Sequence, residues 1–176
     1  MRDNVVVTVG AVIAVLLQVI VAPNIVVFFA MPNFLLVYVC AVSMVRSDNF
    51  LFGMAFILGL LFDLFGNNTV GIMAFLFVLV AFLVSRTFTL FDHEAFLVPL
   101  VMMIVVCLFV EVFYAFALML FGLDISMLDA LILRSLPCAL YDAAVGLIML
   151  PALFHFIKPA DAHTGDYAAH TMVSFR

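Results

Sequence analysis

The chain has 176 residues, of which 69% are hydrophobic and 10% are charged, and its formal net charge is −5. This composition excludes an ordinary water-soluble domain, and the acidic balance offers no basic surface for nucleic acid. The residues outside the apolar runs form only short turns and a tail, which are too small to build a soluble core.

The apolar runs predict membrane-spanning helices. About 20 apolar residues cross the hydrocarbon layer, because a helix rises about 1.5 Å per residue and the layer is roughly 30 Å thick. A β-barrel would need alternating polar and apolar residues, and runs such as LFVLVAFLV have none. We therefore expect an all-α, polytopic integral membrane bundle of about six transmembrane helices within residues 1–157.

The first three predicted helices end at clear breaks. The first spans about 5–22 and stops at Pro23. Its apolar part is longer than that of a usual signal peptide, so we expect it to be retained. The second spans 33–45 and the third 50–65, and the tight polar turn 46–49 between them predicts an antiparallel hairpin.

Three further helices are predicted at about 71–87, 95–121 and 136–157. Proline is tolerated in a first helical turn and disrupts an interior one, so Pro137 places the start of the last helix. Residues 158–176 are small and polar, and we expect them to form a flexible cytoplasmic tail.

The basic residues predict the orientation. Loops rich in lysine and arginine stay in the cytoplasm. If the N-terminus is cytoplasmic, then Arg134 alone lies outside, and five basic residues lie inside. The inside residues are Arg2, Arg46, Arg86, Lys158 and Arg176. We therefore expect a multi-pass protein with both termini in the cytoplasm.

Four charged residues form a candidate polar cluster in the outer half of the bundle: Asp63, Glu111, Arg134 and Asp142. An ionised carboxylate near the centre of a membrane helix costs roughly 2.5 to 3.5 kcal/mol, so these side chains should face the interior. Arg134 is the candidate counter-ion for one carboxylate. The cluster is either structural, fixing how the helices pack, or a proton- or ligand-coupled site. The sequence favours the structural role.

Small residues mark two candidate packing faces. Ala55 and Gly59 are four residues apart on one predicted helix, and Ser135, Ala139 and Ala143 repeat at the same spacing near the last one. Such ladders allow helix backbones to approach closely. Packing within the chain is favoured over packing against a helix of a partner.

No catalytic, cofactor or metal site is predicted. The phosphate-binding loop, the dinucleotide fingerprint and the serine nucleophile elbow are all missing from the sequence. Cys40, Cys107 and Cys138 lie in separate apolar segments without metal-ligand spacing. We expect them to be buried and reduced.

The stretch 56–66, FILGLLFDLFG, followed by Val70-Gly71-Ile72, resembles the central motif of the MreD family. A polar residue near the end of the first helix, Gln18, and a proline before the second helix, Pro32, agree with the family. The chain departs from the family pattern in having asparagine rather than aspartate at position 33. The residues that carry the resemblance are Gly59, Asp63, Gly66, Gly71, Pro32, Pro137 and Tyr141.

The resemblance implies a non-enzymatic scaffold subunit of the bacterial cell-elongation (rod) complex in the inner membrane. Such a subunit binds MreC, shares an assembly with MreB, RodA and a class B penicillin-binding protein, and supports side-wall peptidoglycan synthesis and cell shape. The family is also similar in fold to the S-components of energy-coupling-factor transporters. The alternative function is therefore that of a vitamin-binding subunit, which would need an outward-facing pocket. The scaffold is favoured.

Overall fold

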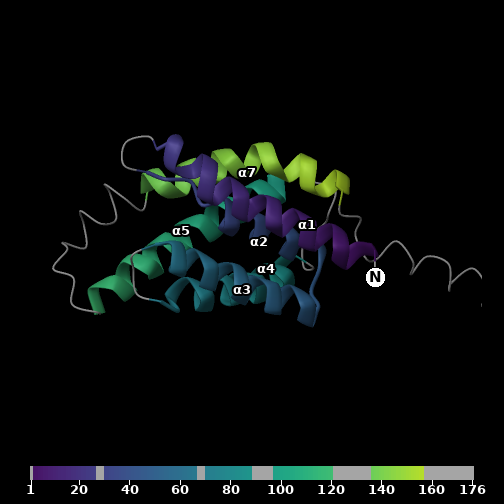
Figure 1. Ribbon diagram of the computed structural model, residues 1–176, viewed down its shortest axis with the longest axis horizontal. Coiled ribbons are helices and arrows are strands. Elements are labelled where there is room, and N and C mark those ends of the chain that lie inside the picture. The colour runs from purple at the N-terminus through teal and green to yellow at the C-terminus, as the bar shows by residue number, and fades with distance from the viewer. Residues whose placement is uncertain (1, 27–29, 67–69, 89–96, 121–135, 157–176) are drawn as a thin grey trace, which may run out of the picture.

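The computed structural model describes residues 2–26, 30–66, 70–88, 97–120 and 136–156, and its elements are all helices (Figure 1). The prediction of an all-α bundle is confirmed for these residues. The α-helices are α1 (Arg2–Leu16), α2 (Phe34–Val45), α3 (Asn49–Phe65), α4 (Ile72–Phe88), α5 (Leu97–Leu120) and α7 (Leu136–Phe156). A π-helix, η1 (Leu17–Val21), and a 3₁₀-helix, η2 (Ala22–Asn24), continue from α1.

Helix α2 lies at the centre of the bundle. It contacts α1, α3, α4, α5 and α7, and every residue from Phe34 to Met44 is buried. Protein therefore surrounds α2 on all sides. Its 12 residues give a length of about 18 Å, which is less than the roughly 30 Å of a hydrocarbon layer, so α2 is too short to cross a bilayer by itself.

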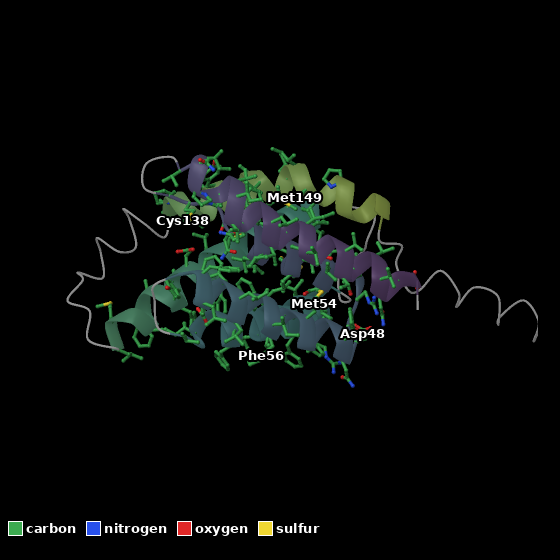
Figure 2. All side chains as sticks on the ribbon, viewed as in Figure 1. Asp48, Met54, Phe56, Cys138 and Met149 are labelled. Atoms are coloured by element: carbon green, nitrogen blue, oxygen red, sulfur yellow. The ribbon has the colours of Figure 1, made fainter. Side chains whose placement is uncertain are left out.

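The helices around α2 turn apolar side chains outward. Ile57 on α3, Phe75 on α4 and Ile148 on α7 are 58%, 66% and 76% exposed. Phe56 points away from the bundle in Figure 2 and is also exposed. An outer surface of this kind is stable in lipid, where apolar side chains meet acyl chains.

Two helical segments, Asp3–Asn24 and Val98–Ala117, are long and apolar enough to cross a membrane. The other apolar helices are shorter: Phe34–Val45, Asn49–Phe65, Ile72–Phe88 and Leu136–Pro151. By length and composition, two candidate spans are therefore found among the described residues, where the sequence predicted about six crossings.

The inner face of α1 and η1 consists of apolar residues and one amide. Val7, Ala11 and Ala14 on α1 and Gln18 on η1 are buried at spacings of three and four residues. The hydroxyl of Tyr38 on α2 donates to the carbonyl of Val7 at 2.6 Å. The first helix was expected to continue to residue 22; instead α1 changes to the π-helical turn η1 at Leu17, and Gln18 faces inward there.

Helices α3 and α4 cross closely at Gly59. A Cβ atom at this position would lie 2.5 Å from the carbonyl oxygen of Met73 and 2.6 Å from the Cα of Ala74. Both atoms belong to the backbone of α4 and cannot rotate away. Glycine is therefore the residue that fits this crossing.

We expect Gly59→Ala to lower the free energy of unfolding by about 1–3 kcal/mol, because the added methyl group forces α3 and α4 apart. All three cysteines are buried, so a thiol-reactive fluorogenic dye reports thermal unfolding in detergent.

Gly53→Ala is the matched control on the same helix, since a Cβ there meets nothing within 4 Å. It should leave stability unchanged or raise it by up to about 1 kcal/mol through helix propensity. Equal melting temperatures for the two variants would contradict the close crossing.

Candidate functional site

The start of α2 is buried inside the bundle, where water cannot pair its free backbone N–H groups. Asn33 is the N-cap residue, and its side-chain Oδ1 accepts from the N–H of Leu36 at 3.0 Å. Asparagine favours this position because its short side chain reaches the first turn. The N–H groups of Asn33 and Phe34 need further acceptors, and side chains of other helices supply them.

Gln18 provides the first of these acceptors. Its Oε1 accepts from the N–H of Phe34 at 2.8 Å, and its Nε2 donates to the carbonyl of Pro32 at 3.2 Å. The side-chain amide of Gln18 thereby satisfies one backbone N–H group and one backbone carbonyl group of the segment that enters α2. The π-helical turn of the first helical segment is held against the start of α2.

Asp142 on α7 provides the second acceptor. Its Oδ1 accepts from the N–H of Asn33 at 2.6 Å, and its side chain is completely buried. The neighbouring Tyr141 donates its hydroxyl to the carbonyl of Ile25 at 2.8 Å. Helix α7 is therefore joined by hydrogen bonds to α2 and to the segment after η2. We call Gln18, Asn33 and Asp142 the α2 cap cluster.

Asp63 performs a similar task for α4. Its carboxylate accepts from the N–H groups of Gly71 at 2.8 Å, Met73 at 3.1 Å and Ala74 at 3.3 Å. Gly71 has a φ of +108°, which glycine adopts without strain. Asp63 and Gly71 of the MreD-like motif thus cap the start of α4 together.

The remaining predicted residues lie as follows. Glu111 on α5 is buried. Arg134 and Ser135 lie outside the described residues, so the predicted pairing of Arg134 stays a prediction. Pro137 is in the first turn of α7.

Two groups of predicted family and packing residues are also placed. Gly66 ends α3 and donates its N–H to the carbonyl of Phe62, while Pro32 is buried before α2. Of the two packing faces, Ala55, Gly59, Ala139 and Ala143 are buried. The structure thus turns these small residues inward.

Sequence reasoning did not place Gln18 and Asn33 in the polar cluster. A signal was available, because Gln18 is a lone amide within an apolar run and Asn33 directly precedes the apolar residues of α2. Their partnership joins residues 14 to 16 apart and then reaches α7, 109 residues from Asn33. Local patterns do not contain contacts at such separations.

The described residues do not contain a group of three histidine, cysteine or acidic side chains that could hold a metal ion. Their three cysteines are buried. The polar side chains of the α2 cap cluster and Asp63 bind backbone N–H groups. These hydrogen bonds stabilise the buried starts of α2 and α4.

An apolar helical bundle with polar side chains on its buried helix ends is typical of an integral membrane protein. The comparison with family models is more specific. Residues 1–159 match the model described as rod shape-determining protein MreD, and the chain belongs to this family. The comparisons with curated proteins and with solved structures each found no match. The predicted family is thereby confirmed, and with it a membrane protein that determines rod shape.

We expect Asp63→Ala to lower the free energy of unfolding by about 1–3 kcal/mol, because N–H groups at the start of α4 lose their acceptor. Asp63→Asn keeps one side-chain oxygen and should lie between the alanine variant and the natural chain. The dye-based melting temperature in detergent is the measurement.

Leu64→Ala is the control for this series, since Leu64 is adjacent and 61% exposed. Its effect should stay within about 0.5 kcal/mol. An alanine variant at position 63 that melts with the natural chain would show that the carboxylate is dispensable.

Gln18→Met preserves the length of the side chain and removes both hydrogen bonds to the segment entering α2. We expect a loss of about 1–3 kcal/mol, because the N–H of Phe34 and the carbonyl of Pro32 remain buried without partners. Val19→Met on the next, exposed position serves as control. Indistinguishable melting of the two methionine variants would argue against the cap.

Proposed function

We propose that this chain is a non-enzymatic, multi-pass scaffold subunit of the bacterial rod complex that binds MreC in the inner membrane. In this role it supports side-wall peptidoglycan synthesis beside MreB, RodA and a class B penicillin-binding protein. The family match carries the proposal. The contacts of Gln18 and Asp63 support it, because these side chains bind backbone groups inside the bundle.

The central position of α2 supports a multi-pass arrangement. The helices that cover α2 bury their inner faces against it and expose apolar outer faces. Removing any of them from the bilayer would expose both α2 and its own apolar surface to water. The assembled bundle is therefore expected to lie in the membrane as one unit, with α2 shielded inside.

The charges at the two ends of the bundle support cytoplasmic termini. Arg46 lies where α2 ends, and its Nη2 donates to Asn4 near the start of α1 at 2.7 Å and also pairs with Asp48. Arg86 lies in the last turn of α4 at this same end. Asp48 and Cys138 mark opposite ends of the bundle in Figure 2. Asp63 lies in the last turn of α3, at the other end of the helix from its N-cap Asp48, and Asp142 lies about one turn after Cys138 on α7. The positive-inside rule assigns the arginine end to the cytoplasm.

The likeness to S-components of vitamin transporters stays a prediction, because no solved structure matches the chain. A vitamin site would need polar groups aimed at a ligand. In the structure, Gln18 and Asp63 instead direct their polar atoms to backbone groups. The scaffold is the function that these contacts favour.

The test is site-specific photo-crosslinking in living cells. A photoreactive phenylalanine analogue replaces one exposed apolar residue on each outer helix: Val9, Ile57, Phe75, Val105 or Ile148. If a helix of MreC docks on one side, then positions on that side should crosslink to MreC and the others should not.

Val39 on α2 is the matched control, because it is completely buried. It should give no crosslink to MreC. Purification that yields transporter ATPases and a bound vitamin, with no crosslink to MreC from any outer helix, would overturn the scaffold proposal.

A further inference from the structure

Two polar atoms of the α2 cap cluster take part in none of the hydrogen bonds described above. Asn33 Nδ2 and Asp142 Oδ2 are buried, and neither has a hydrogen-bond partner among the described residues. Asn33 is 3% exposed and Asp142 is 0% exposed. An unpaired buried donor or acceptor destabilises a fold by about 1–3 kcal/mol, and a carboxylate oxygen by more.

The two atoms belong to residues joined by the 2.6 Å hydrogen bond from Asn33 N to Asp142 Oδ1. The Oδ1 of Asn33 accepts from the N–H of Leu36, so the other atom of this amide must be the NH₂ group. The site therefore presents an amide donor at the N-cap of α2 and a carboxyl oxygen on α7.

Two polar side chains that bind the segment before α2, Gln18 and Tyr141, are already engaged. Both ends of the Gln18 amide bind the segment that enters α2, and the hydroxyl of Tyr141 binds the carbonyl of Ile25. A ligand must thus accept from an amide and donate to a carboxylate at the same time. A bare cation could satisfy only the carboxyl oxygen of Asp142. The NH₂ group of Asn33 would repel it, because the hydrogen atoms of this group carry partial positive charge.

We propose that this position binds a structural water molecule, which accepts from Asn33 Nδ2 and donates to Asp142 Oδ2. Buried waters occupy such sites between otherwise unsatisfied polar groups. The contact between α2 and α7 then consists of one direct hydrogen bond and one bridge through water. The start of the central helix is hydrated at this point.

The test is magnetisation transfer from water to the nitrogen-15-labelled full chain in lipid nanodiscs, observed by nuclear magnetic resonance. The side-chain amide of Asn33 should receive magnetisation from water. The backbone amide of Leu36 is the matched negative control, because it lies in the same turn and is bonded internally to Asn33 Oδ1. The exposed amide of Asn24 is the positive control.

Asn33→Asp identifies the signal, because it removes the NH₂ group and keeps an oxygen for the N–H of Leu36. The signal assigned to Asn33 should disappear in this variant while that of Asn24 persists. Transfer to Asn33 no stronger than to Leu36 would overturn the proposal. A crystal grown in rubidium salt gives a second outcome: anomalous density for rubidium between the two atoms would replace the water by a cation.

Discussion

Every buried helix start in this protein must find acceptors for its N–H groups, and the rest of the architecture follows from this requirement. In an apolar medium an unpaired backbone group is too costly to persist. Helix α2 begins inside the bundle, and Gln18, Asn33 and Asp142 supply the acceptors from three parts of the chain. Asp63 supplies them for α4.

Because these polar side chains cap helices inside the bundle, the outer surface can be apolar. The apolar outer faces belong to α1, α3, α4, α5 and α7. Such faces interact with lipid or with the apolar side chains of another membrane helix. A member of the MreD family built in this way is suited to act through contacts with neighbours in the bilayer.

Part of the site could be predicted from the sequence. A carboxylate within an apolar helix must face protein, which placed Asp63, Glu111 and Asp142 inside. The expectation of one cluster was too coarse, since Asp63 binds the start of α4 and Asp142 binds the start of α2. Both are single acidic residues in apolar surroundings, and the sequence around them does not reveal which helix start each will meet.

The sequence alone determined the helical class, the family and the inward direction of Asp63, Glu111 and Asp142, because solvation acts on each residue type whatever its partners are. The tertiary structure decided that the short α2 is central and that Gln18, Asn33 and Asp142 meet at its start. It also decided that Gly59 touches the backbone of α4. These features depend on distances between segments far apart in the chain, which only the packing of the helices fixes.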